Sequence, residues 1–153
     1  MLKPYFKTQK DNPQPLSFTV ERQVRFEEVD SLGIVWHGRY PSYLEDARGA
    51  LGQNYGINYL DFHKYGVIAP IKKMHIDYHQ PLTYPDVFTI EGILHWSDAA
   101  RLNYEYIIRN EKGEVMTTGY TVQMMLDLEK NLYMVLPPFY ENFCRRWKAG
   151  ELR

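Results

Sequence analysis

The sequence predicts one two-layer α+β domain, in which a single long helix packs against an antiparallel sheet. Five segments alternate apolar and polar residues with the period of two that half-buried strands require, and one segment has the 3.6-residue period of an amphipathic helix. The chain has 153 residues, of which 44% are hydrophobic and 24% are charged, as is typical of a globular domain.

The chain is expected to begin with an arm, residues 1–16, which precedes a single domain, residues 17–153. The arm carries three prolines and mixed charges without any apolar period, so we expect it to be poorly ordered or to extend along a sheet edge. The first strand is expected over residues 17–26. Arg22 interrupts its apolar face, which is otherwise formed by Phe18, Val20, Val24 and Phe26.

The long helix is expected over residues 40–51, where Pro41 suits the first turn and Gly52 and Gly56 are stop signals. The connection over residues 54–64 has room for one more helical turn. The apolar face of the long helix follows the i, i+3, i+4, i+7 spacing and consists of Tyr40, Tyr43, Leu44, Ala47, Ala50 and Leu51.

Four more strands are expected, over residues 73–79, 87–96, 101–109 and 116–126, with a hairpin turn at residues 110–113. A short C-terminal helix follows, because Phe139, Phe143 and Trp147 share one helical face. Half-polar strands need cover on one face only, so the second face and the edges of the sheet are expected to meet a partner subunit.

Composition excludes several classes of partner. The net charge is −1, from 18 basic and 19 acidic residues, so no overall field attracts nucleic acid or an anionic membrane. The N-terminal segment lacks the apolar core of a signal peptide, and no run of residues approaches a membrane span, so we expect a cytoplasmic protein. The single cysteine, Cys144, excludes an internal disulfide and is expected to be a buried thiol.

Residues 28–48, EVDSLGIVWHGRYPSYLEDAR, place an acid, a glycine and a histidine at set offsets where a strand meets the long helix. The pattern DxxGIVxHxxYxxYLExAR resembles the signature of the hotdog-fold acyl-CoA thioesterases of the 4-hydroxybenzoyl-CoA thioesterase type. The resemblance extends over about 120 residues, through IDYHQPLTYPDVFTI and NEKGEVMTTGYTVQMMLD. Val29 departs from it, since the family usually has threonine or cysteine before the acid.

The resemblance implies a hotdog fold, in which a curved five-stranded antiparallel sheet wraps a long central helix. It also implies an acyl-CoA substrate, no cofactor, and a homodimer or homotetramer with active sites between subunits. Asp30 is the implied catalytic acid, either as a nucleophile that forms a mixed anhydride or as a general base that activates water. The backbone N–H of His37 is implied to polarise the thioester carbonyl, while its ring positions the substrate or the water.

Elementary chemistry explains this pattern, because thioester hydrolysis needs an attacking group and a donor for the developing oxyanion. A helix N-terminus offers free N–H groups and the positive end of a dipole. Gly33 allows a sharp turn with positive φ. Tyr40 is the first residue of the expected helix and lies beside the site. Ile34, Val35 and Trp36 are expected to line or support a water-poor pocket, which strengthens electrostatic interactions.

Other polar residues are weaker candidates. Glu45 lies off the apolar helix face, so it either pairs with a neighbour such as Arg48 or faces the adjacent subunit and assists the site. Candidate contacts for the phosphates of CoA are Lys72, Lys73 and Arg101. His75, Asp77 and His79 share one side of a strand, but we expect an exposed polar face there and no metal.

Two rival functions remain open. An acyl-thioester dehydratase or hydratase also uses an acid and a histidine on this fold, although its motif order differs. A non-catalytic hotdog protein would bind an acyl-CoA without cleaving it.

Overall fold

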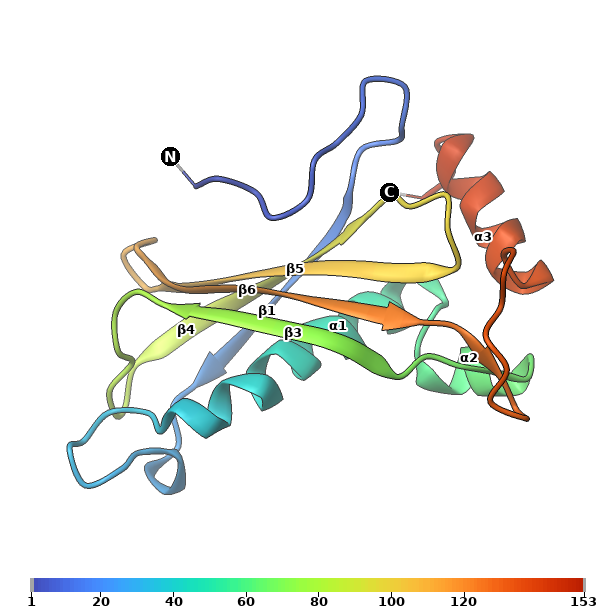
Figure 1. Cartoon of the computed structure of the whole chain (residues 1–153). Coiled ribbons are helices and arrows are strands. Elements are labelled where there is room, and N and C mark those ends of the chain that lie inside the picture. Colours follow the sequence, from blue (N-terminus) through green and yellow to red (C-terminus); the bar gives the residue numbers. More distant parts are fainter. Residues whose placement is uncertain (1, 153) are drawn as a thin grey trace.

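The computed structural model describes residues 2–152, and it contains a five-stranded antiparallel sheet with one long helix along one face (Figure 1). The elements follow in the order β1 (Leu16–Gln23), η1 (Phe26–Glu28), η2 (His37–Arg39), α1 (Tyr40–Tyr55), α2 (Tyr59–Lys64), β2 (Val67–Ile68), β3 (Ile71–Tyr78), β4 (Val87–His95), β5 (Arg101–Asn110), β6 (Val115–Met124), β7 (Leu126–Asp127) and α3 (Pro138–Lys148). The expected fold class is therefore confirmed.

The strands of the main sheet follow the order β1-β4-β5-β6-β3, and β2 pairs separately with β7. All the pairings in the main sheet are antiparallel, and one continuous row crosses its five strands through Leu16, Leu94, Tyr104, Thr121 and Met74. Within the described chain β3 pairs with β6 alone. The second edge of β3 therefore has no strand partner among residues 2–152.

The core lies between α1 and the sheet. The predicted apolar face of α1 is confirmed, because Tyr43, Leu44, Ala47 and Leu51 have no exposed surface. Gly92 in β4 permits this close approach, since a Cβ at that position would lie 3.3 Å from the carbonyl oxygen of Ala47. The helix and the sheet are thus in direct backbone contact.

The first strand is shorter than expected, because β1 ends at Gln23 and the chain then leaves the sheet. Val24 is buried beyond the strand, where its N–H donates to the carbonyl oxygen of Asp86 at 2.8 Å. Phe26 begins the 3-10 turn η1 and is exposed. The alternation continues in sequence beyond the strand, but the backbone there turns to build a loop.

The N-terminal arm crosses the sheet on the face opposite α1 (Figure 1). Tyr5 donates its backbone N–H to Glu105 at 3.3 Å, and its hydroxyl donates to Asp77. The ring of Tyr5 also packs on Tyr120, with ring centroids 5.0 Å apart. Farther along the arm, the carbonyl oxygen of Gln14 accepts a hydrogen bond from the Trp147 indole at 2.9 Å. The arm is therefore anchored on the sheet face and on α3.

The C-terminal helix α3 closes one end of the core, where Trp147 packs on Trp96 with ring centroids 5.1 Å apart. Cys144 on this helix is buried as expected, and burial raises the pKa of its thiol to about 12. No helix in residues 2–152 is both long enough and apolar enough to cross a membrane.

Buried tyrosines are expected to make the fold sensitive to alkali. Burial raises the pKa of the Tyr104, Tyr106 and Tyr140 hydroxyls above the usual value of 10, and that of Tyr5 rises to about 12. The folded state therefore keeps protons that the unfolded chain releases, so stability is lost as the pH rises from about 10 to 12. Urea unfolding measured across this range should show a falling free energy of unfolding, and a constant value would contradict the expectation.

Candidate active site

Residues 28–37 form a tight loop between β1 and α1, which we call the Asp30 loop. The N–H of Asp30 donates to the carbonyl oxygen of Ile34 at 2.8 Å, and the N–H of Gly33 donates to the carbonyl oxygen of Asp30 at 3.0 Å. Gly33 has a φ of +78°, a value that favours glycine, so its expected conformation is confirmed. The turn holds Asp30 at the wall of a cavity of about 320 Å³.

The Asp30 carboxylate has one oxygen engaged and one open. Oδ1 accepts a hydrogen bond from the N–H of Leu32 at 2.8 Å, which stabilises the turn. Within residues 2–152, no protein group donates to Oδ2. Turn stabilisation and chemistry are therefore compatible roles for this side chain, because the turn orients the carboxylate while Oδ2 remains available to water or a substrate.

The same cavity is lined by His37, at the entrance to α1. Its carbonyl oxygen accepts a hydrogen bond from the Tyr78 hydroxyl at 2.9 Å, which fixes this end of the loop to β3. Its backbone N–H has no acceptor among the described residues. A free N–H at a helix start, beside the positive end of the helix dipole, suits a developing oxyanion.

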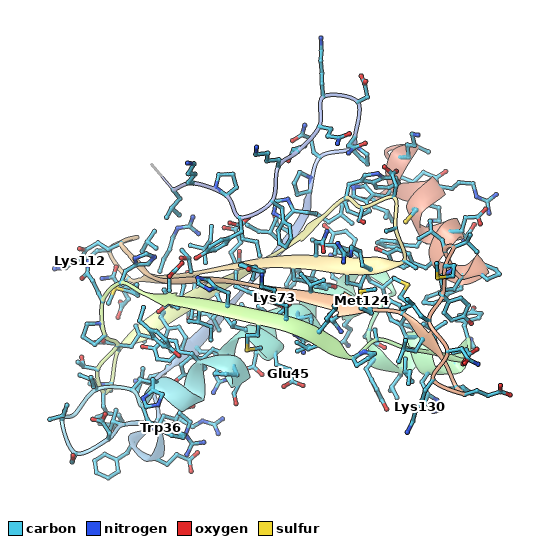
Figure 2. All side chains as sticks on the ribbon, viewed as in Figure 1. Trp36, Glu45, Lys73, Lys112, Met124 and Lys130 are labelled. Atoms are coloured by element: carbon cyan, nitrogen blue, oxygen red, sulfur yellow. The ribbon has the colours of Figure 1, made fainter. Side chains whose placement is uncertain are left out.

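The cavity wall is mostly apolar and includes Ile34, Val35 and Tyr40. Tyr40 is buried, and burial raises the pKa of its hydroxyl. Trp36 does not line the cavity: its side chain lies at the loop surface and is 49% exposed (Figure 2). Its ring instead covers Gly38, where any Cβ would collide with it. A side chain at position 38 would therefore require the Trp36 ring to move.

Glu28 is a buried acid beneath the loop that the sequence analysis did not single out, and it is 5% exposed. Its Oε1 accepts the N–H of Arg25 at 2.8 Å, and its backbone oxygen accepts the N–H of Trp36 at 2.9 Å. Arg22 lies 3.5 Å from its second carboxylate oxygen. The Arg22 side chain also lies over the buried ring of Tyr43. In the sequence, Arg22 interrupts the apolar face of the first strand, and this cation was the feature that could have indicated a buried acidic partner.

Replacing Glu28 with glutamine is expected to loosen the Asp30 loop. The free energy of unfolding should fall by about 1–3 kcal/mol, because the half-buried Arg22 guanidinium loses its charged partner. The kcat for thioester hydrolysis should fall roughly 10-fold, because the loop positions the reacting groups. The matched control is Glu27→Gln, since the Glu27 side chain is 66% exposed. Equal urea stability and equal rates in the two variants would contradict this role.

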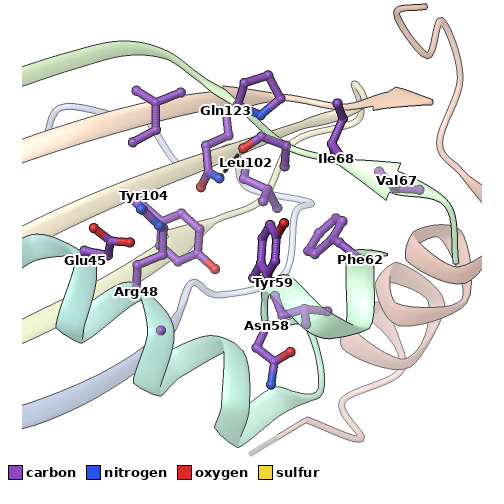
Figure 3. Close-up of a pocket in the computed structure, with 15 residues that line it drawn as sticks. Glu45, Arg48, Asn58, Tyr59, Phe62, Val67, Ile68, Leu102, Tyr104 and Gln123 are labelled. Atoms are coloured by element: carbon purple, nitrogen blue, oxygen red, sulfur yellow. Dashed lines mark hydrogen bonds between the residues drawn. The ribbon is translucent and has the colours of Figure 1, made fainter. Parts of the chain in front are cut away.

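Glu45 is not brought to Asp30 within the chain. It lines a second cavity of about 460 Å³, which we call the helix-side cavity, between α1, α2 and the start of β3 (Figures 2 and 3). The polar residues around it are Glu45, Arg48, Asn58, Tyr59, Tyr104 and Gln123. That Glu45 either pairs with a neighbouring side chain or faces a second subunit stays a prediction.

The three candidate CoA-binding cations line neither cavity. Lys72 is exposed on β3. Lys73 lies over the ring of Tyr120 at 5.6 Å, on the sheet face that the N-terminal arm covers (Figure 2). Arg101 is directed to the sulfur of Met124 at 3.8 Å. Their contact with CoA therefore remains an expectation.

The polar face of β3 is engaged with the arm. Nε2 of His75 lies 2.9 Å from the Asp77 carboxylate. Hydrogen bonds from Tyr5 and then from His75 lower the pKa of Asp77. His79 bonds to Thr118 at 2.9 Å and lines the Asp30 cavity. Within residues 2–152, no group of three or more His, Cys, Asp or Glu side chains is arranged to hold a metal ion.

The fold and the Asp30 loop define a class of protein. Residues 24–146 match the family model described as the thioesterase-like superfamily, and the chain belongs to this superfamily. A relative from Bacillus subtilis (strain 168), YneP, whose name assigns it provisionally to the acyl-CoA thioesterases, is 31% identical over 71% of this chain and 79% of its own length. The 1,4-dihydroxy-2-naphthoyl-CoA hydrolase of Thermosynechococcus vestitus is 27% identical over 82% of this chain and 86% of its own length.

Solved structures agree with this assignment. The DHNA-CoA thioesterase of Staphylococcus aureus superposes with a TM-score of 0.77 at 26% identity, covering 88% of this chain and 93% of that one. The hotdog fold and the enzyme class, a thioester hydrolase of the acyl-CoA thioesterase family, are therefore confirmed.

Proposed function

We propose that this protein hydrolyses an acyl-CoA to the free acid and CoA, as an enzyme of the 4-hydroxybenzoyl-CoA thioesterase type acting in the cytoplasm. One observation carries the proposal: the open Oδ2 of Asp30 and the unpaired N–H of His37 belong to residues that line one cavity. An attacking group and an oxyanion donor are the two elements that acyl transfer from a thioester requires.

Two chemical routes use these groups. As a general base, Asp30 takes a proton from water, and the hydroxide attacks the thioester carbon. As a nucleophile, Oδ2 attacks the carbon itself, and water later cleaves the mixed anhydride. In both routes the oxyanion accepts a hydrogen bond from the His37 N–H, and its collapse expels the CoA thiolate. Such a donor typically contributes about 10²–10³ in rate.

The relatives named for 1,4-dihydroxy-2-naphthoyl-CoA support a CoA thioester as the substrate and an aromatic acyl group as its acid part. The Asp30 cavity also suits a thioester, because its wall is mostly apolar while its two reacting groups are polar.

A homodimer, which is able to pair further into a tetramer, is part of the proposal. The free edge of β3 presents unpaired backbone groups, which favour pairing with another strand. It also exposes large apolar side chains, with Ile71 42%, Met74 37% and Tyr78 50% exposed. A second copy that pairs edge to edge around a two-fold axis would cover this surface.

The test is release of free thiol by the purified protein from a panel of aliphatic and aromatic acyl-CoA thioesters. Turnover with thiol release supports the proposal. Hydration of an enoyl-CoA without thiol release would favour the dehydratase class. Tight binding of acyl-CoA without any turnover would favour a binding protein.

A further inference from the structure

A third cavity, of about 490 Å³, is lined both by the N-terminal arm and by the sheet face that the arm crosses, and we call it the arm cavity (Figure 1). Among the residues that the structure describes, His79 alone lines both the arm cavity and the Asp30 cavity. His79 follows directly on β3, and the chain continues along the Asp30 cavity through Gln80 and Pro81. His79 therefore links the arm to the wall of the candidate active site.

Four side chains at the arm cavity form one series of hydrogen bonds, which we call the Tyr5 relay. The Tyr5 hydroxyl bonds to the Asp77 carboxylate and also lies 2.8 Å from the hydroxyl oxygen of Thr118. That oxygen in turn lies 2.9 Å from Nε2 of His79. Thr118 is buried, so its hydroxyl depends on these two partners.

The number of available protons gives the Tyr5 relay one direction. Hydrogen bonds from Tyr5 and then from His75 lower the pKa of Asp77, so this carboxylate is ionised at neutral pH and only accepts. Burial, and then Asp77, raises the pKa of the Tyr5 hydroxyl to about 12, so the hydroxyl keeps its proton and donates it to Asp77. Thr118 must then donate its own proton to the Tyr5 oxygen, and it can only accept from His79. Nε2 of His79 is therefore the first donor of the series.

The backbone of the arm is fixed separately at the same place. The N–H of Tyr5 donates to Oε2 of Glu105 at 3.3 Å. The other carboxylate oxygen of Glu105 lies 2.8 Å from Nε2 of the buried His95, and the Phe6 ring packs on His95 with ring centroids 5.2 Å apart. These contacts hold the Tyr5 hydroxyl in a defined position on the sheet.

The cavity wall after β3 has weak backbone support. The N–H groups of His79 and Gln80 both donate to the carbonyl oxygen of Met116, each at 3.0 Å, so one acceptor serves two donors in place of a regular ladder. The imidazole of His79 adds a side-chain attachment to the sheet. A series of hydrogen bonds that ends on a charged carboxylate, here Asp77, is stronger than one isolated bond, because each bond polarises the next.

We infer that the N-terminal arm is part of the active-site architecture, and that Tyr5 and Thr118 are positioning residues that act through His79 to hold the wall of the Asp30 cavity against the acyl-CoA. The inference rests on the proposed hydrolase function and adds to it a role for a segment outside the catalytic loop. The Tyr5 relay contacts neither the Asp30 carboxylate nor the His37 N–H. Its loss should therefore weaken substrate binding more than the chemical step.

Tyr5→Phe tests this role in the intact chain, since phenylalanine keeps the ring contact with Tyr120 and loses only the hydroxyl. With benzoyl-CoA and hexanoyl-CoA as substrates, KM should rise roughly 10-fold while kcat stays within about 2-fold of the wild type. The matched control is Tyr55→Phe, because the Tyr55 hydroxyl also donates to an oxygen, that of Ser17 at 3.4 Å, but lines neither cavity. An unchanged KM in folded Tyr5→Phe, or an equal rise in the control, would overturn the positioning role.

Thr118→Val breaks the Tyr5 relay at its centre and should raise KM by a similar factor. In the double variant with Tyr5→Phe, KM should rise no further than in the stronger single variant, because both substitutions interrupt the same series of bonds. Thr19→Val is the control, since Thr19 is exposed on β1. Single effects that multiply in the double variant would contradict a relay.

Two measurements without substrate separate a failure of this inference from a failure of the hydrolase function. Nitrogen NMR of the imidazole rings should show that Nε2 of His79 carries a proton. Hydrogen exchange at the amides of His79 and Gln80 should be roughly 10-fold faster in Tyr5→Phe than in the wild type or in Tyr55→Phe. A bare Nε2 or unchanged exchange would overturn the inference. A wild-type protein that releases thiol from no acyl-CoA would instead contradict the proposed function.

Discussion

Replacing Asp30 with asparagine is expected to lower kcat for acyl-CoA hydrolysis by about 10²–10⁴-fold. Asparagine retains the Oδ1 acceptor for the Leu32 N–H, so the turn should survive. The amide can neither accept the proton of water nor form a mixed anhydride as a carboxylate does, so both proposed routes fail. Stopped assays of thiol release over several acyl-CoA substrates measure the loss.

The control for this variant is Asp11→Asn, an equivalent change at an exposed acid of the N-terminal arm. Its rate should equal that of the wild type. A folded Asp30→Asn protein with an undiminished rate would remove Asp30 from the mechanism. A KM that rises while kcat is unchanged would assign Asp30 to substrate binding instead.

Replacing Met74 with lysine is expected to separate the proposed dimer. Met74 lies in the middle of the exposed β3 strand, so a two-fold axis there brings the two introduced charges close together. Facing like charges cost several kcal/mol, so the dimer dissociation constant should rise by at least about 100-fold. Analytical ultracentrifugation over a concentration series measures this change. Hydrolysis should fall together with the dimer fraction, since each site is expected to need both subunits.

Met134→Lys is the matched control, because Met134 is strongly exposed and lies outside β3, in the segment between β7 and α3. It should leave both association and rate unchanged. An active Met74→Lys monomer would contradict an active site shared between subunits. A Met74→Lys dimer of undiminished affinity would place the interface elsewhere.

Local patterns predicted most of the fold correctly. The helix period predicted α1, and alternation predicted four strands with bounds close to those observed, because one buried face imposes these periods. The hairpin turn at residues 110–113 was likewise predicted from its own residues. β1 was predicted too long, because Val24 is buried by a loop rather than by the sheet, and alternation cannot distinguish these two environments.

The candidate site was predictable in part. Asp30, Gly33 and His37 stand within eight residues of one another, so their juxtaposition follows from one tight turn. Glu28 was missed because an acid in a charged segment does not by itself indicate burial; the only signal was its partner Arg22, which interrupts the apolar face of the first strand. Trp36 was expected near the pocket wall, but its ring covers Gly38 at the surface, since side-chain direction depends on the loop conformation.

By itself the sequence determined the fold class, the order of elements and the loop with its acid, since these depend on short-range periodicity and turn chemistry. Only the tertiary structure decided which distant side chains meet. It brought Arg22 to Glu28, placed Arg48, Tyr104 and Gln123 around one cavity, and left the β3 edge open. These features depend on strand order and on the packing of a helix across a sheet, which link residues far apart in the chain.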